Sequence, residues 1–249
     1  MKIVFGTLLA AILAFACARD EAWEKDQSAQ KEPETIIHPQ TATKTAEQIM
    51  GEAEEHWKKR FDRKEIEQAI AKWEYLCKVE PSFETYTKLS YAYYLFADAH
   101  ISSDTDEQQA EHYLSTLDKG TNAGENALMY YSDDFKRLLS EGKPVEEAVK
   151  AIDKGGVPAM FWYSTNLGRW AKTKGFSTIL LYKNRVKTVM DHIISLDDSY
   201  FYHAPHRYMA AFYSVAPGFA GGDINKAKEE FDLLKNKHPN HFVVNTLMA

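Results

Sequence analysis

Two histidines and an arginine stand among aromatic residues in the segment YFYHAPHRYMAAFY, residues 200–213. His203 and His206 are three residues apart, which approaches the spacing of metal ligands on one helix face. Pro205 lies between them, however, and no third Cys, His or acidic ligand is near in the sequence, so the pattern disfavours zinc. Aromatic rings supply apolar area and Tyr adds a polar tip, so this cluster, with Arg207, can line a partly wet cavity. We expect the segment to bind a ligand without a metal or other cofactor.

No other motif in the chain predicts catalysis. Gly221-Gly222-Asp223 has the glycines of a phosphate loop, but no strand precedes it and no Lys-Ser/Thr pair follows at the required place. Asp223 is more simply the N-cap of the helix that follows, with the glycines allowing the turn. The sequence holds no Ser/His/Asp or paired-carboxylate signature, and we do not expect an enzyme.

A second aromatic face carries an amide. On a predicted helix over residues 159–172, Tyr163, Asn166 and Trp170 share one face with Leu167 at helical spacing. Asn166 either satisfies a backbone group inside the core or contacts a ligand, and both readings remain open. For any single aromatic residue, core packing is the simpler explanation. The candidate ligand-lining residues are Trp162, Tyr163, Asn166, Trp170, Tyr202, His203, His206, Arg207 and Tyr208. A further predicted helix, residues 84–99, carries Tyr86, Tyr91, Tyr93, Tyr94 and Phe96.

The helices that must position these residues contain a repeated pattern. Two sets of residues share the offsets 0, 4, 7 and 12: Ala69, Trp73, Leu76 and Pro81, and Ala227, Phe231, Leu234 and Pro239. Degenerate copies are Ala110, Leu114, Leu117 and Asn122, and Val186, Met190, Ile193 and Asp198. A small residue at a helix contact, two large apolar residues and a helix-ending Pro or Asx are typical of the second helix of a tetratricopeptide repeat.

The repeat predicts an all-α fold. The copies are spaced irregularly, so we expect four or five irregular, tetratricopeptide-like helix hairpins in an α-solenoid, curved or closed around a central pore or cleft. Residues 145–152 are expected to be helical. The run FSTILLY at residues 176–182 is the only one that resembles a strand, and a long helix through Lys187 accounts for it better.

Composition limits the class of protein. The chain has 249 residues, of which 45% are hydrophobic, enough to bury a core in one domain or one repeat array. Its formal net charge is −6, which makes nucleic acid an unfavourable partner. Of its two cysteines, Cys77 lies in an apolar helical pattern and is expected to be a small buried hydrophobe.

The N-terminus predicts export. Residues 1–16 combine Lys2 with an apolar run too short for a permanent membrane span, which is typical of an export signal. The sequence Ala14-Phe15-Ala16-Cys17 is either a lipoprotein signal, with Cys17 as the acylated first residue, or a plain A-x-A cleavage site; we favour the lipoprotein. Residues 17–45, rich in Glu, Lys, Gln and Thr, are expected to be a flexible tether, and residues 46–249 the helical domain.

Three segments carry a resemblance to a known family. LGRWAKTKG at 167–175, SLDDSYFYHAPHRYMAAFY at 195–213 and APGFAGGDINKAKEEF at 216–231 resemble the T component of tripartite ATP-independent periplasmic (TRAP) transporters, a family of tetratricopeptide lipoproteins. The likeness covers most of residues 46–249. Its most specific element is the succession of aromatic residues, Ala-Pro-His-Arg and Gly-Gly-Asp.

The resemblance implies a non-catalytic protein of the periplasm, held by a lipid anchor on a bacterial membrane, with the outer membrane favoured. It also implies a homotrimer with a hydrophobic pore through each protomer, a solute-binding subunit of a TRAP transporter as partner, and an apolar or amphipathic small molecule as ligand. His203 stands where a small residue is expected, which would narrow or polarise the pocket. The given sequence stops at Met248-Ala249, where the resemblance implies a closing helix. The alternative is a tetratricopeptide scaffold lipoprotein of envelope or outer-membrane assembly, which would bind peptide segments in an open groove.

Overall fold

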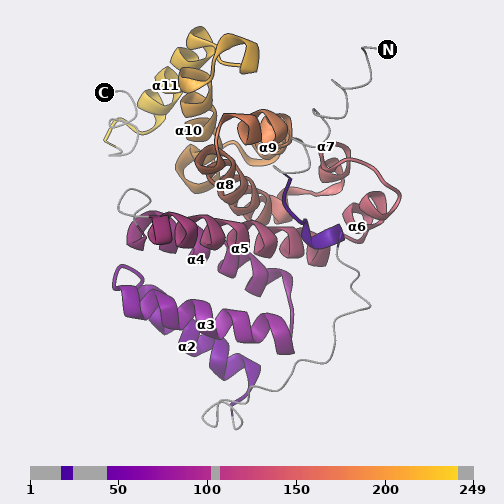
Figure 1. Cartoon of the computed structure of the whole chain (residues 1–249), viewed down its shortest axis with the longest axis vertical. Coiled ribbons are helices and arrows are strands. Elements are labelled where there is room, and N and C mark those ends of the chain that lie inside the picture. Colours follow the sequence, from indigo (N-terminus) through magenta and orange to yellow (C-terminus); the bar gives the residue numbers. More distant parts are fainter. Residues whose placement is uncertain (1–17, 25–43, 102–106, 241–249) are drawn as a thin grey trace, which may run out of the picture.

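The structure, a computed structural model, describes residues 18–24, 44–101 and 107–240 and consists there of helices without strands. Most helices form antiparallel neighbours in chain order (Figure 1). The pairs are α2 (Ala46–Lys58) with α3 (Arg63–Val79), α4 (Phe83–His100) with α5 (Glu107–Tyr131), α8 (Val157–Lys174) with α9 (Phe176–Asp197), and α10 (Tyr200–Val215) with α11 (Ile224–Lys237). Shorter elements are η1 (Ala22–Glu24), α6 (Asp133–Ser140), α7 (Val145–Ala148), η3 (Val149–Ala151), η4 (Lys154–Gly156) and η5 (Gly218–Ala220).

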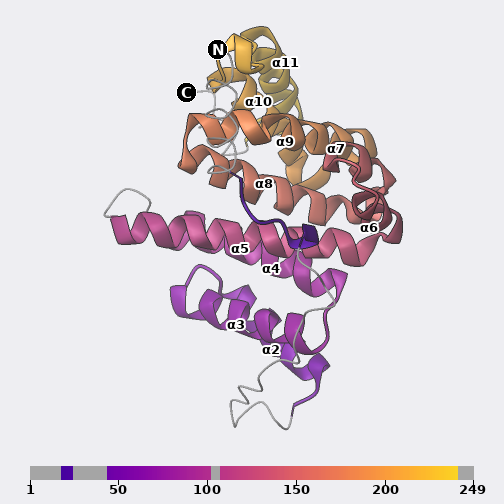
Figure 2. The same ribbon diagram turned by 45° about the vertical axis from the view of Figure 1, so that its right-hand side comes forward.

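Each pair packs on the next along the long axis of the molecule. Helix α3 contacts α4, both α4 and α5 contact α8, and α9 contacts α10. The α2–α3 pair therefore lies at one end and the α10–α11 pair at the other (Figures 1 and 2). The prediction of an all-α fold is confirmed.

In two of the four copies the repeated residues pack as their spacing predicts. Ala69, Trp73 and Leu76 are all buried in α3, and Val186, Met190 and Ile193 are all buried in α9. Side-chain caps start several helices, among them Asp223, whose carboxylate accepts from the backbone N–H groups of Asn225 and Lys226 at the start of α11. The N-cap role predicted for Asp223 is confirmed. The run at residues 176–182 is helical, as expected, because it opens α9.

Two predicted helix boundaries were wrong. Asn122 does not end a helix, because α5 continues to Tyr131. Packing against α4 and α8 on both sides sustains α5, and Asn is a weaker helix stop than the Pro of the better copies. Residues 145–152, predicted as one helix, form the single turn of α7 followed by the 3₁₀ turn η3.

The N-terminal segment differs from the expected tether. Residues 18–24 lie against α5 and α9, with Arg19, Glu21 and Ala22 buried. The predicted export signal (1–16), the acylation site Cys17 and residues 25–43 lie outside the described residues. Of the expected tether, the structure describes residues 18–24, which belong to the folded body, and Lys44 and Thr45, of which Thr45 caps α2.

Candidate functional site

Helix α10 contains an unusual stretch of backbone. Phe201, Tyr202 and His203 have φ angles of 47°, 61° and 56°, in the left-handed region. Each non-glycine residue there costs about 1–2 kcal/mol, so the surrounding structure must stabilise the turn. Arg207 does so, because its guanidinium donates to the backbone carbonyl of Tyr202 and, at 3.1 Å, to that of Phe201. Strained backbone of this kind is concentrated at functional sites.

Two histidines, His203 in this turn and His206 after it, contact residues in and just after α11. His203 Nδ1 lies 2.8 Å from Nε2 of His238, and His206 Nδ1 lies 2.6 Å from a carboxylate oxygen of Glu230. Burial, followed by the nearby His238, lowers the pKa of His203. Within the described residues, no group of three or more His, Cys, Asp or Glu side chains is arranged to hold a metal ion. The two histidines thus make contacts between helices.

The left-handed turn places Phe201 in an aromatic cluster. Trp162 of α8 stacks on Tyr91 of α4, with ring centroids 3.7 Å apart and an angle of 9° between the planes. Phe201 meets Trp162 edge-on at 5.4 Å, and Tyr200 meets Phe161 edge-on at the same centroid distance. We call the following residues the aromatic cluster: Trp57, Tyr91, Tyr94, Phe161, Trp162, Tyr200 and Phe201.

The aromatic cluster reaches the surface at α10. Trp162 is buried, but Phe201 is 40% exposed and the neighbouring Tyr202 is 62% exposed. Apolar side chains from α2, α4, α8 and α10 therefore form a continuous set from the core to solvent. This arrangement can hold an apolar group but contains no nucleophile or acid–base pair.

The other predicted residues of α8 lie in the core. Asn166 is fully buried, and its Nδ2 donates to the backbone carbonyls of Ser90, at 3.0 Å, and Trp162, at 2.9 Å. Its amide packs against Gly120 of α5, where a Cβ atom would lie 2.3 Å from Asn166 Oδ1. These contacts favour the structural reading of Asn166 over ligand contact. Tyr163 is fully buried one turn earlier.

Trp170 of α8 packs on α9, and Tyr208 of α10 packs on Gly168 of α8. The Trp170 ring meets Tyr182 of α9 edge-on at 5.9 Å. The Tyr208 hydroxyl approaches α8 so closely that a Cβ atom at Gly168 would lie 2.2 Å from it. Tyr208, Gly168 and Met209 line a small cavity of about 40 Å³ between α8, α9 and α10, room for little more than water.

A larger cavity lies elsewhere. It has a volume of about 350 Å³, opens between α4 and α5, and is lined by Tyr86, Leu89, Tyr93, Asp118, Lys119, Asn122, Ala123 and Asn126. None of the nine predicted ligand-lining residues borders it. The structure thus disperses those residues: Trp162 lies in the aromatic cluster with Tyr202 beside it, Tyr163 and Asn166 in the core of α8, Trp170 against α9, His203 and His206 at the α10–α11 contact, Arg207 at the left-handed turn and Tyr208 at the small cavity.

Sequence reasoning missed some members of the aromatic cluster. Tyr91 was noted as one of several aromatic residues on its helix, and no spacing distinguished it from Tyr86 or Tyr93. Phe201 was missed because only the left-handed turn directs it toward Trp162. Neither Gly nor Asn marks that turn in the sequence.

A family model described as TRAP transporter T-component matches residues 76–246. The chain belongs to this family. No curated protein matches it. Membership gives this T component an accessory role in a TRAP transport system and confirms the resemblance stated from the sequence.

The matched range contains most of the aromatic cluster and the whole α10–α11 contact. It leaves out residues 18–24, α2 and most of α3, although the helices that hold residues 18–24 fall inside it. Among the helices the structure describes in this T component, none has the length and apolar character needed to cross a membrane.

Proposed function

We propose that this T component is a non-catalytic periplasmic lipoprotein that binds the solute-binding subunit of its TRAP transporter together with an apolar or amphipathic small molecule. Family membership supports the transport role. The aromatic cluster supports the ligand class, because stacked and edge-on rings that continue to the surface favour apolar groups. The observation that carries the proposal is the partly exposed aromatic set at the meeting point of α4, α8 and α10.

The ligand site that we propose is the exposed edge of the aromatic cluster, at Phe201 and Tyr202. Arg207 lies beside it, and two of the five N–H donors of its guanidinium bond to backbone carbonyls. The remaining donors are suited to a carboxylate head group, while the exposed rings of Phe201 and Tyr202, backed by the buried Trp162, contact the apolar tail. His203, next to them, would make this end of the site more polar.

The assembly is also part of the proposal. We propose that the stacked helix pairs are a tetratricopeptide-like solenoid with a pore and that three copies associate. We also propose that acylation of Cys17 holds the protein on a bacterial membrane, with the outer membrane favoured. The order of the pairs, each packed on the next, supports the solenoid. Acyl chains contribute about 0.8 kcal/mol of membrane affinity for each buried methylene group.

Ligand binding can be tested by native mass spectrometry of gently purified protein, followed by titration with a panel of fatty acids and other amphipathic molecules. Trp162→Leu should weaken binding at least about tenfold, since stacked aromatic contacts are lost. Trp170→Leu is the matched control, because Trp170 is equally buried but packs on Tyr182 outside the aromatic cluster. No carried molecule and no binding to any member of the panel would count against the proposal.

A scaffold that binds peptide segments is the second candidate. The open cavity of about 350 Å³ between α4 and α5 favours it, because its lining mixes tyrosines with amides and charges, as peptide-binding surfaces do. Peptide display against the purified protein distinguishes the two candidates. The scaffold is favoured if peptides bind the unchanged protein, if Tyr93→Ala and Asn126→Ala each abolish that binding, and if no amphipathic small molecule binds.

A further inference from the structure

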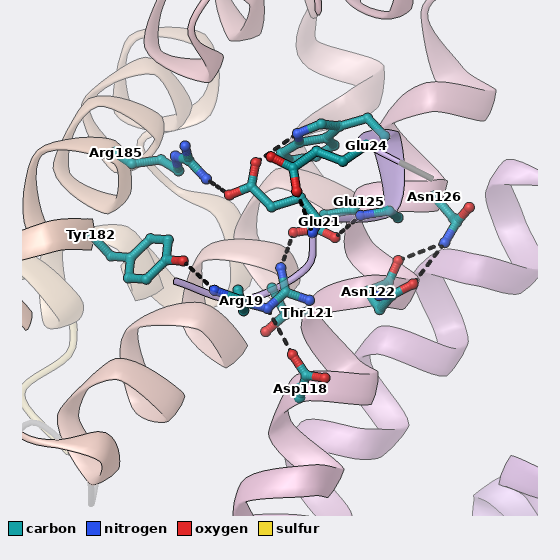
Figure 3. A network of polar contacts seen from close by, with 12 residues as sticks. Arg19, Glu21, Glu24, Asp118, Thr121, Asn122, Glu125, Asn126, Tyr182 and Arg185 are labelled. Carbon is teal, nitrogen blue, oxygen red and sulfur yellow. Dashed lines mark hydrogen bonds and ion pairs between the residues drawn. The ribbon is translucent and has the colours of Figure 1, made fainter. Parts of the chain in front are cut away.

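The segment Ala18–Glu24, here called the clasp, is bound to the helical body by charged and polar contacts (Figure 3). Arg19 of the clasp donates from Nε to Asp118 of α5 at 2.7 Å and from a terminal nitrogen to Glu125, two turns further along the same helix. Its backbone N–H donates to the hydroxyl of Tyr182 of α9 at 3.0 Å. One residue of the clasp therefore joins two helices.

Glu125 is a buried carboxylate that is paired with the clasp. Its side chain is fully buried, and both oxygens are used: one accepts from Arg19 and the other accepts from the backbone N–H of Ala22 at 2.7 Å. A carboxylate buried without a partner is strongly unfavourable, whereas one that is matched by a guanidinium is tolerated. The interior of the body thus presents a charge that the clasp neutralises.

The second half of the clasp is held equally well. Glu21 accepts from Arg185 of α9 and, at 2.7 Å, from the indole N–H of Trp23. The Trp23 ring meets Phe135 of α6 and Tyr163 of α8 edge-on, with centroids 5.9 and 6.0 Å away. Contacts to α5, α6, α8 and α9 together fix the segment, so it does not act as a free linker.

The clasp lies next to Cys17 in the sequence, which limits the distance between the body and a lipid anchor on Cys17. Only Ala18 separates Arg19 from Cys17. Two residue steps span at most about 7 Å, whereas a flexible tether of the length expected for residues 17–45 would hold the body about 30 Å away on average. Residues 25–43 follow the clasp and connect it to α2, so they add nothing to the distance between Cys17 and the body.

We propose that the clasp fixes the membrane anchor to the middle of the body, so that the T component lies with its α5–α9 side toward the membrane, and α2, at one end of the body, lies farther from the anchor (Figures 1 and 2). This inference rests on the proposed acylation of Cys17. It differs from the tether expected from the sequence in two ways: the body is held close to the lipid surface, and it has one orientation there. The surface that meets the solute-binding subunit is then restricted to the remaining sides.

Fluorescence quenching on vesicles tests the orientation. In the full chain with Cys77→Ser, one probe is attached at Asn184→Cys, an exposed position of α9 two residues after Tyr182, and another at Glu47→Cys, an exposed position of α2. The acylated protein is bound to vesicles of phosphatidylethanolamine and phosphatidylglycerol that carry a nitroxide on the head group. We expect quenching at Asn184→Cys to exceed quenching at Glu47→Cys severalfold.

Two variants then release the anchor in different ways. Arg19→Glu places a negative charge beside Asp118 and Glu125, so it should detach the clasp and make quenching at the two probe positions equal. Arg137→Glu, the same change at an exposed position on α6, is the control and should leave the difference in quenching intact. A Gly-Ser spacer of about ten residues inserted after Ala18 leaves the clasp bound but lengthens the connection, and should lower quenching at both positions. The result with the spacer variant tests the inference even if the Arg19→Glu protein does not fold.

The outcomes separate the inference from the proposal on which it rests. Incorporation of labelled palmitate is measured on the same samples, with Cys17→Ser as the reference. No incorporation overturns the lipoprotein and the inference together. Acylated protein with equal quenching at Asn184→Cys and Glu47→Cys, or with quenching that the spacer does not change, overturns the inference alone.

Discussion

The ring of Trp162 lies parallel to that of Tyr91, and this stack joins α8 to α4 at the centre of the aromatic cluster. Stacked aromatic pairs contribute about 0.5–1.5 kcal/mol beyond the area they bury. A double-mutant cycle with Tyr91→Leu and Trp162→Leu should therefore give a coupling energy of that size in urea unfolding. The pair Tyr91 and Trp170 serves as control and should give no coupling. A value below about 0.3 kcal/mol for the first pair would contradict the stack.

Gly168 should tolerate no side chain. A Cβ atom there would lie 2.2 Å from the Tyr208 hydroxyl, so Gly168→Ala should lower the free energy of unfolding by about 1–3 kcal/mol. Tyr208→Phe removes the clashing oxygen and should restore most of that loss. Gly51→Ala is the control: nothing lies within 4 Å of a Cβ atom in α2, and the change should stabilise the protein by about 0.5–1 kcal/mol. Urea unfolding of the four proteins measures these effects.

Glu125 should give the stability a distinct pH dependence. Burial raises the pKa of Glu125 from 4.5 to about 7, against the opposing effect of Arg19. A carboxyl whose pKa is higher in the folded than in the unfolded state binds its proton more tightly when the protein is folded. The contribution of Glu125 to the free energy of unfolding is therefore complete below pH 4.5 and is lost as the pH rises through about 7. Glu125→Gln should remove this part of the pH dependence. Unfolding at pH 5 and pH 8 measures it, with the exposed Glu141→Gln as control.

The α10–α11 contact should weaken in acid. Because burial and His238 lower the pKa of His203 below its ordinary 6.5, the unfolded state binds the proton more readily. The stabilising contribution is therefore present above pH 6.5 and is lost as the pH falls through the lower pKa of the folded protein. Protection factors for amide hydrogen exchange in α11, which are corrected for the intrinsic pH dependence of exchange, should be lower at pH 5.5 than at pH 7.5.

His203→Ala, which installs the small residue expected from the family resemblance, should remove most of that pH difference. His112→Ala, at an exposed histidine of α5, should leave it unchanged. An equal pH response in His203→Ala and the unchanged protein would show that His203 is not responsible.

The sequence alone is sufficient to predict the ends of those helices whose local signals agree with their packing. In α3, α9 and α11, small and large apolar residues at fixed offsets precede Pro81, Asp198 and Pro239, and each helix ends just before its stop residue. The same offsets failed in α5, where neighbouring helices carry the chain past Asn122. Tertiary contacts decide such cases, and a single sequence does not contain them.

The site was less accessible to prediction. Trp162 was correctly placed among aromatic residues, but its partner Phe201 depends on a left-handed turn without Gly or Asn. Arg19 was assigned to a tether because its neighbours are polar and charged, and its partner Glu125 lies 106 residues away. A buried ion pair of that separation leaves no periodic pattern in the sequence.

The contacts of Arg19 also impose an order on folding. Its three helical partners, Asp118, Glu125 and Tyr182, are 99, 106 and 163 residues further along the chain. A segment that is synthesised before its partners must therefore remain unpaired until α9 has followed it and packed. Closing so long a loop is slow and costs conformational entropy, so the clasp should be the last part of the T component to reach its final place.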